Sequence, residues 1–382
     1  MAKLQHDLGI ALILCFGLLT TLGICRLIKP EDTTLRLVSA LFRHGDRTVD
    51  TENNESFPTD PYKDYNYYPD GGGQLTDAGK KRVYQLGQTL RNKYNRFLGN
   101  LYYQPNVYAH STMVARAKMT LQLVLAALYP PADVQKWNPL LPWQPIDFTY
   151  FYDAQDILMF PILCPVYIRL YKEMQETPEI KTKVAEFADL MKEVSNHTGN
   201  NIKTTFNLFF VYNTLVAETY YGLRLPQWTQ GIFPNGKLLD ATLFQFDLFS
   251  YGKLKSKNGG VLLRKVINDM DGVINGTLKD RKINLFSGHD INMAALLYAL
   301  NIFDYQTPKF SSSVIIELHE KGSQFFVKVL HYLGVPPKMV EKIIPGCEIL
   351  CPYDKFVLLT SESTATDEEM ECPEKMILRF DF

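Results

Sequence analysis

The sequence contains one short stretch in which residue types suited to chemistry stand close together, Arg43-His44-Gly45-Asp46-Arg47. Arginine suits phosphate because its guanidinium is planar, permanently charged and weakly hydrated. A histidine between two guanidiniums has its proton affinity lowered by like-charge repulsion, so a neutral His44 can act as a nucleophile in mildly acidic solution. The stretch therefore predicts an anion-binding turn that carries a nucleophile. An ordinary polar turn is the alternative.

The elements around this turn can be predicted from their patterns. Residues 35–42 are apolar enough to form a buried strand that leads into the turn. Gly45 lets the backbone pass close to a ligand, because glycine has no Cβ. Residues 50–73, rich in tyrosine and proline, are expected to form a long loop that lines the site. Thr76 then caps an amphipathic helix that reaches about Leu98.

A second strand, turn and helix follow. We expect a short strand over residues 106–109, a cap at Ser111-Thr112, and a helix over residues 113–128. Arg116 falls near the first turn of that helix, where a cation gains nothing from the helix dipole. Its position therefore favours a site that needs positive charge, and a solvated surface arginine is the alternative.

A third junction carries His289 and Asp290. Residues 283–286 predict a strand, Ser287-Gly288 a turn, and the polar pair opens a helix over residues 291–300. A protonated Asp290 can act as a general acid if it reaches the leaving-group oxygen. The alternative is that Asp290 caps the helix and His289 is an ordinary core histidine.

The three junctions are expected to meet. In open α/β sheets, ligands bind outside the carboxyl ends of the strands, so the side chains there can line one pocket. Three arginines and two histidines around one point would repel one another unless an anion were bound. A phosphoryl group supplies that anion, and its transition-state charge is what these donors would stabilise.

The fold class predicted is α/β, a mixed sheet flanked by helices. Residues 150–258 differ from the rest in predicted secondary structure, because they are expected to be mainly helical, with helices at 182–194 and 205–221. They are interpreted as a helical cap inserted into an α/β body that comprises residues 26–149 and 259–382. In the second half of the body, Gly259-Gly260 leads into a helix over residues 261–274. Strands at 313–319 and 324–332 are expected to close one edge of the sheet.

Composition bounds the partners and the compartment. The chain has 382 residues, 46% of them hydrophobic, which predicts a large core and two to three domains. Its net charge of -1 gives no reason to expect nucleic acid or an anionic membrane surface as a partner. Residues 1–25 are typical of a signal peptide, with Gly23 and Cys25 at −3 and −1 of a cleavage site. A signal anchor is the alternative.

Secretion makes the remaining cysteines informative. Cys164, Cys347, Cys351 and Cys372 lie outside the signal segment, and four cysteines in an oxidising compartment predict two disulfides with three connectivities. A tight local bridge between Cys347 and Cys351 would leave Cys164 to join Cys372. A zinc half-site is the rival, but no nearby histidine pair completes it. Glycosylation acceptors at Asn54, Asn196 and Asn275 agree with the secretory route.

Together, these motifs resemble the histidine acid phosphatase family over nearly the whole mature chain. Within that family the sequence is similar in particular to the venom-type acid phosphatases of insects, in residues 121–131, 214–228 and 347–356. The motifs that carry the resemblance are Arg43 to Thr48, Gly73 to Gly79, Ser111-Thr112 with Arg116, Leu125 to Pro131, Ser287 to Asp290, and Pro345 to Pro352.

The resemblance implies a role for each matching position. His44 resembles the nucleophile that becomes a phosphohistidine, and Asp290 the proton donor for the leaving alcohol. The phosphate clamp implied comprises Arg43, Arg47, Arg116 and His289. The family needs no metal or other cofactor, and it has an α/β body with a helical insert. The likeness also supports disulfides between Cys347 and Cys351 and between Cys164 and Cys372.

Four positions depart from the family's usual pattern. None of them removes a catalytic group, so they put the substrate range in doubt more than the activity. They are Val49 where the family usually has proline, Met113 where it has aspartate, Gly288 where most members have alanine, and Ile291 where most have threonine.

The function expected is a secreted, extracellular acid phosphatase that hydrolyses phosphate monoesters through a phosphohistidine. The lysosome is the alternative compartment. We expect no membrane anchor after signal cleavage, and a homodimer is left open. A phytase or a lysophosphatidate phosphatase is the narrower alternative, and an inactive secreted binding protein or antigen on the same scaffold is the alternative from another class. Metal-dependent hydrolysis is disfavoured, since no spacing of His, Asp and Glu forms a ligand set.

Overall fold

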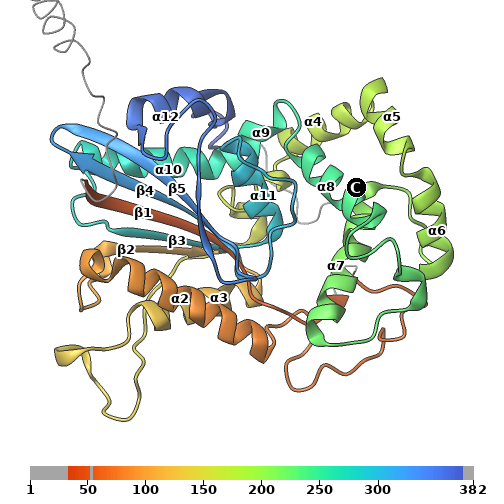
Figure 1. Ribbon diagram of the computed structural model, residues 1–382, viewed down its shortest axis with the longest axis horizontal. Helices are drawn as coiled ribbons and strands as arrows, with labels where there is room; N and C mark the ends of the chain where they lie inside the picture. Colours follow the sequence, from red (N-terminus) through yellow and green to blue (C-terminus); the bar gives the residue numbers. More distant parts are fainter. Residues whose placement is uncertain (1–32, 52–54, 373–382) are drawn as a thin grey trace, which may run out of the picture.

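The structure is a computed structural model that describes residues 33–51 and 55–372 (Figure 1). The signal segment expected over residues 1–25 and the glycosylation acceptor Asn54 lie outside these residues.

Within the described residues, seven strands form one mixed sheet in the order β2-β3-β1-β4-β5-β6, with β7 paired to β5. β1 and β2 both run parallel to β3, whereas β4 pairs with β1 and with β5 in the antiparallel sense. The bounds are β1 Thr34–Arg43, β2 Val107–Ser111, β3 Ile283–Gly288, β4 Ser313–Lys321, β5 Gln324–Tyr332, β6 Met339–Lys342 and β7 Cys351–Pro352.

Helices cover both faces of this sheet (Figure 1). β1 lies between β3 and β4, and its side chains alternate between two cores. Leu37 and Leu41 belong to one core, and Val38 and Phe42 to the other. The first core is closed by α10 (Gly259–Ile274), α11 (Asp290–Ala299) and α12 (Tyr353–Thr360), and the second by α2 (Asp77–Leu98) and α3 (Ala115–Leu128). Burial on both faces explains why the strand is apolar throughout.

Further helices lie beside the sheet, most of them at the right of Figure 1. They fall between β2 and β3 in the sequence and pack largely into clusters of their own. Their bounds are α4 Pro165–Gln175, α5 Pro178–Ala185, α6 Ala188–Thr198, α7 Thr205–Tyr221, α8 Lys237–Phe249 and α9 Leu254–Lys257.

Several predicted elements are confirmed, and the prediction of one helix is wrong. Thr76 caps α2 by accepting a hydrogen bond from the Gly79 amide at 3.1 Å, and α7 has the predicted bounds. The helix expected over residues 182–194 is instead divided between α5 and α6. The two parts serve different cores, because Ile180 of α5 packs with one cluster, whereas Leu190 of α6 packs with another. The chain turns between them.

A predicted helix cap and a predicted turn are also wrong, because Ser111 and Gly288 belong to strands. Ser111 ends β2 and is paired with Ser287 of β3, so it does not cap a helix; α3 begins only after Val114. Gly288, expected in a turn, is paired with Arg43 of β1. The reason is that β3 lies between two strands: pairing with β2 extends it to Ser287, and pairing with β1 extends it to Gly288.

The hairpin and the start of α10 differ from expectation as well. β4 and β5 do not close an edge, because β4 lies inside the sheet and β5 pairs onward with β6 and β7. Gly259 is inside α10 rather than in a loop before it. A Cβ at Gly259 would lie 1.9 Å from the carbonyl oxygen of Ala295, so glycine allows α10 to pack directly on α11.

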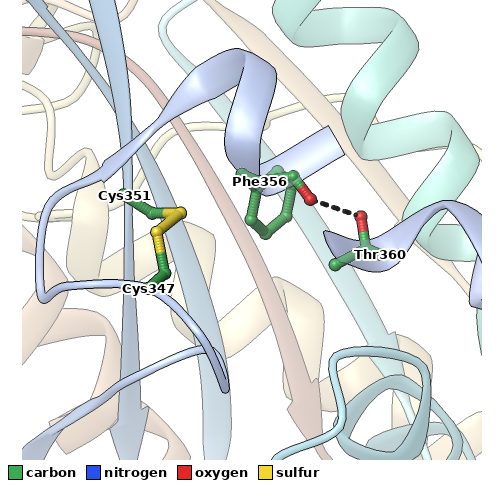
Figure 2. The surroundings of a disulfide bond; sticks show 4 residues. All are labelled: Cys347, Cys351, Phe356 and Thr360. Atoms are coloured by element: carbon green, nitrogen blue, oxygen red, sulfur yellow. Dashed lines mark hydrogen bonds between the residues drawn. A yellow bond between two sulfur atoms is a disulfide. The ribbon is translucent and has the colours of Figure 1, made fainter. Parts of the chain in front are cut away.

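Both predicted disulfides are present. Cys347 and Cys351 form a local bridge beside α12, where the hydroxyl of Thr360 donates to the Phe356 carbonyl at 2.9 Å (Figure 2). Cys164, at the start of α4, is joined to Cys372 across 208 residues of sequence. The zinc half-site alternative is therefore wrong. In residues 33–51 and 55–372, no helix is both long and apolar enough to cross a membrane.

Candidate active site

Three neighbouring strands bring their carboxyl ends to one edge of the sheet. His44 follows β1, Thr112 follows β2 and His289 follows β3, and these strands are adjacent in the order β2-β3-β1. The backbone fixes the junctions to one another: the His44 amide donates to the Gly288 carbonyl at 3.0 Å, and the Thr112 amide to the Ser287 carbonyl at 3.1 Å. The predicted convergence of the three junctions is therefore what the sheet produces.

The His44 imidazole is oriented by two hydrogen bonds. Its Nδ1 lies 2.9 Å from the Gly45 carbonyl oxygen, which only accepts, so Nδ1 carries the proton. The opposite nitrogen, Nε2, accepts from Nε of Arg116 at 3.2 Å. His44 is thus a buried, neutral imidazole whose lone pair on Nε2 lies beside a guanidinium.

Electrostatics keep this imidazole neutral. Burial lowers the pKa of His44 well below its ordinary value of 6.5, and repulsion from Arg116, Arg43, His289 and Arg47 lowers it further. An unprotonated His44 is therefore available in acidic solution, as the sequence predicts. Burial is the larger of the two causes, and the sequence motif alone indicated only the repulsion.

Gly45 has a different use from the one expected. A Cβ at this position would lie 2.7 Å from the Gly79 carbonyl oxygen, so the close approach is to the first turn of α2 rather than to a ligand. The Gly45 amide donates to the Thr120 hydroxyl of α3 at 3.3 Å. The turn is therefore fixed between the two helices that cover this face.

His289 stands next to His44. The two rings are 5.3 Å apart in an edge-to-face arrangement, and Nε2 of His289 lies 3.1 Å from the Thr112 hydroxyl. Burial, followed by repulsion from Arg116, Arg43 and Arg47, lowers the pKa of His289 well below 6.5. His289 is at the N-terminus of α11, where its amide donates to the Asn292 side chain at 2.9 Å.

Each arginine of the site is paired with one carboxylate. Nη2 of Arg43 lies 2.9 Å from Asp290, and Nη1 of Arg116 lies 2.7 Å from Asp50. Arg47 holds both oxygens of Glu55 at 2.5 Å. The carboxylates offset part of the repulsion expected among these cations. Part of it remains, because burial and then repulsion from Arg47 lower the pKa of Arg43 and of Arg116.

Arg43 is further fixed by two neighbours. Its Nη1 donates to the Pro308 carbonyl at 2.6 Å, and its guanidinium lies 4.2 Å from the centre of the Phe310 ring. A guanidinium held in this way keeps its orientation when a ligand enters. It is buried, with 4% of its surface exposed.

A cavity of about 250 Å³ contains the predicted residues together. All six of the predicted catalytic and phosphate-binding side chains line it: Arg43, His44, Arg47, Arg116, His289 and Asp290. In the part of the chain that the structure describes, no group of three or more His, Cys, Asp and Glu residues is arranged to hold a metal ion.

Other residues that line this cavity were not predicted from the sequence. Asp50 and Glu55 belong to the loop that was predicted to line the site, so their acidic side chains in that loop were a usable signal. Thr112, which contacts His289 but does not line the cavity, was interpreted as a helix cap. Asp153 and a group of apolar side chains gave no local signal, because tertiary packing of the helices between β2 and β3 brings them here.

Comparison with known proteins identifies the family. Residues 34–332 match the model of the histidine phosphatase superfamily, branch 2. The chain belongs to this family. This phosphatase is 42% identical to the venom acid phosphatase of Apis mellifera, over 94% of this chain and 93% of that protein. It is 33% identical to the lysosomal acid phosphatase of Rattus norvegicus, over 92% and 84%, and 31% identical to the prostatic acid phosphatase of Homo sapiens, over 88% of each.

Solved structures agree on the fold of this phosphatase. The Hafnia alvei phytase in its apo form superimposes with a TM-score of 0.64 at 17% identity, covering 91% of this chain and 100% of that one. The phytase of Klebsiella sp. ASR1 gives 0.63 at 20%, covering 90% and 99%. The expected family and mixed-sheet fold are confirmed, and so is the expected class of enzyme, an acid phosphatase acting on phosphate monoesters.

Proposed function

We propose that this protein is a secreted acid phosphatase that transfers the phosphoryl group of a monoester to His44 and then to water. The observation that carries the proposal is the state of His44: buried, neutral, protonated at Nδ1 and surrounded by three arginines of one cavity. A lone pair on Nε2 is what an attack on phosphorus requires.

In the first step, Nε2 of His44 attacks phosphorus and the bond to the leaving oxygen breaks. Arg43, Arg47, Arg116 and His289 hold the three remaining phosphoryl oxygens, where charge is concentrated in the transition state. Because each guanidinium is already fixed by a carboxylate, little reorganisation accompanies binding.

Asp290 gives its proton to the leaving oxygen. In the free enzyme it is paired with Arg43 at 2.9 Å. A phosphate dianion in the cavity competes with this carboxylate for Arg43, which frees Asp290 to meet the leaving oxygen. In the second step, water attacks the phosphohistidine, Asp290 takes the proton of that water, and phosphate leaves.

The test is turnover together with trapping of the intermediate. The mature protein should release 4-nitrophenol from 4-nitrophenyl phosphate in mildly acidic buffer, and rapid quenching should leave an acid-labile phosphoryl group on the chain. His44→Ala should abolish both signals. His197→Ala, an exposed histidine of α6, is the matched control and should keep both. Turnover retained in the His44 variant would overturn the assignment.

The compartment follows from a smaller set of observations. The venom and lysosomal acid phosphatases among the relatives and the disulfides support a secreted or lysosomal protein. We favour the extracellular route, with cleavage after Cys25 and glycans at the exposed Asn196 and Asn275. Expression in insect cells checks this: the protein should appear in the medium with residue 26 at its N-terminus and should lose mass on glycosidase treatment.

The domain division is a proposal of the same kind. Residues 150–258 are proposed as a helical insert in a body of residues 26–149 and 259–382. Two observations support it: β2 and β3 pair directly although these residues separate them, and α4, α6 and α7 pack largely in clusters apart from the sheet.

A further inference from the structure

The cavity that His44 lines is also lined by a group of aromatic side chains. Phe206, Phe209 and Phe210 come from α7, and Phe249 ends α8. Their rings pack against one another, with centres 4.7 Å apart for Phe206 and Phe210 and 5.8 Å apart for Phe206 and Phe249. We call these four side chains, with Phe160, the aromatic wall.

The aromatic wall is joined to the phosphate site. The Phe160 ring is centred 5.8 Å from that of His289, and Ile291, directly after Asp290, also lines the cavity. Asp290 is the residue that meets the leaving oxygen under the proposed function. A leaving group that extends from that oxygen into this cavity therefore meets apolar surface within a few ångströms.

The charged groups of the cavity also favour an apolar leaving group over an anionic one. Among the described residues that line it, the only lysines or arginines are Arg43, Arg47 and Arg116, and all three are used to hold one phosphoryl group. The other charged groups are the carboxylates of Asp50, Glu55, Asp153 and Asp290. A second phosphate on the leaving group would thus meet phenyl rings and carboxylates, where no cation offsets its desolvation.

One further cation lies close by. Lys309 lines a neighbouring cavity of about 180 Å³ that shares Arg43, Asn213 and Asp290 with the first. An anionic leaving group would have to enter that smaller space, which is also bounded by Tyr212, Val216 and Phe246. The smaller cavity therefore adds a cation to the surroundings of the leaving group, whereas the larger one adds the aromatic wall.

We propose that the aromatic wall makes this enzyme selective for monoesters with an aromatic or otherwise apolar leaving group, and a poor catalyst for esters that carry further phosphates. The proposal rests on the proposed function, since it concerns the same cavity. It assigns the specificity to α7, whereas the phosphoryl chemistry belongs to the three strand ends. Binding of the remote part of a substrate raises kcat/KM when it is retained in the transition state, as it is for a fixed apolar wall.

The experiment compares alkyl phosphates with leaving groups of similar basicity, so that wall contacts rather than bond strength decide the result. The probes are ethyl phosphate, 3-phenylpropyl phosphate and inositol hexakisphosphate, each assayed by phosphate release. We expect kcat/KM for 3-phenylpropyl phosphate to exceed that for ethyl phosphate by about tenfold or more. Inositol hexakisphosphate should be the poorest of the three per phosphate group.

Variants of the wall should change the ratio of these values. Phe206→Ala with Phe210→Ala should bring the ratio of phenylpropyl to ethyl phosphate to within about threefold. Phe187→Ala, which removes a half-buried ring packed on Phe244 away from the cavity, should leave the ratio unchanged. If the double alanine variant does not fold, Phe206→Leu with Phe210→Leu keeps most of the apolar volume of the wall. This variant should lower the ratio of phenylpropyl to ethyl phosphate. The ratio of hexyl to ethyl phosphate, measured with hexyl phosphate as a further probe, should stay the same.

Three results would overturn the proposal. The first is a wild-type ratio near one, and the second is faster turnover of inositol hexakisphosphate than of 3-phenylpropyl phosphate. The third is a ratio that Lys309→Ala changes and the wall variants do not, which would place the leaving group in the smaller cavity. Each leaves hydrolysis through His44 intact, whereas failure of the proposed function would appear as turnover of ethyl phosphate by His44→Ala.

Discussion

His44 must be unprotonated to attack phosphorus, and its surroundings lower its pKa well below the ordinary value of 6.5. This has a cost in stability. Because the folded chain binds fewer protons at His44 and His289 than the unfolded chain, both residues make folding less favourable as the pH falls below about 6.5.

Removing the charge of Arg116 should move the pH profile. After burial, Arg116 is the largest cause that lowers the pKa of His44. Arg116→Gln should therefore raise that pKa, so that the nucleophile becomes protonated at a higher pH and the acid limb of kcat/KM shifts upward. Arg116→Lys keeps the charge and should keep the limb. Profiles of kcat/KM between about pH 3 and 7 measure this shift. Coincident acid limbs for the two variants would show that the charge of Arg116 does not lower the pKa of His44.

Asp290→Asn should discriminate between leaving groups. A general acid contributes about 10²–10⁴-fold when the departing oxygen needs a proton. Alkyl phosphates should therefore lose most of their turnover, whereas 4-nitrophenyl phosphate, whose phenolate departs without much help, should lose far less. An equal loss for both esters would mean that Asp290 acts by holding Arg43, its partner at 2.9 Å, rather than by donating a proton.

For individual residues, the residue types predicted which side chains meet, but they did not predict which carboxylates pair with the arginines. Arginines and histidines at three strand ends could be predicted to converge, because parallel strands place their carboxyl ends together. The pairing of Arg116 with Asp50 and of Arg47 with Glu55 could not, since it depends on the path of a loop without regular structure.

Among the elements, α7 has two separate tasks at successive turns along one side of the helix. Phe206, Phe209 and Phe210 line the cavity, whereas Thr214 and Glu218 face the loop that follows β1. The Thr214 hydroxyl donates to the Glu55 carbonyl at 2.7 Å, so the loop that holds Arg47 is attached to the helix that carries the aromatic wall. The Tyr67 and Tyr221 rings add a second attachment, with centres 5.2 Å apart.

Glu218→Gln should flatten the dependence of stability on pH. Burial, then repulsion from Asp60, raises the pKa of Glu218 to about 8. Between the ordinary value of 4.5 and 8, the folded chain keeps a proton that the unfolded chain has lost, so the free energy of unfolding falls as the pH rises and levels off above 8. Glutamine cannot ionise. The stability of the variant relative to wild type should therefore increase from pH 5 to pH 8.

Denaturant unfolding at the two pH values measures this effect. Glu193→Gln, an exposed carboxylate of α6, is the control and should give the same difference at both. A Glu218 variant that also gave the same difference would show that the buried carboxyl is not protonated in the folded enzyme.

The elements themselves could be predicted where their pattern is local. β1, β5, α2 and α7 follow from apolar periodicity and capping residues. The break between α5 and α6 and the inclusion of Gly259 in α10 could not be predicted, because each depends on a partner distant in sequence. The position of β4 inside the sheet could not be predicted either, because nothing in residues 313–332 shows that β4 pairs with β1 on the side away from β5.

Over the whole molecule, the two disulfides close loops of very different length. Cys164 and Cys372 are separated by 208 residues, and Cys347 and Cys351 by 4. Closing the longer loop removes more entropy from the unfolded chain, by about 5 kcal/mol against about 2 kcal/mol. Cys164→Ser with Cys372→Ser should therefore destabilise the protein more than Cys347→Ser with Cys351→Ser.

The two double variants are compared by denaturant unfolding under non-reducing conditions, with hydrolysis of 4-nitrophenyl phosphate as the check on the folded state. Both should remain active at low temperature, since neither bridge supplies a polar group to the His44 cavity. Equal losses of stability would show that loop length does not decide the contribution of these bridges.

The position of β1 in the sheet has a consequence for how the enzyme is made. Ser39 of β1 is hydrogen-bonded to Asn284 of β3, 245 residues later, and Leu41 to Ser313 of β4, 272 residues later. At a synthesis rate of about 5–20 residues per second, the strand that carries the nucleophile remains without partners for on the order of 10–50 seconds. During that time α4 to α9 are complete and can pack locally, whereas β1 is an apolar segment with open edges. We therefore expect chaperones of the translocation pathway to bind this segment of the nascent chain.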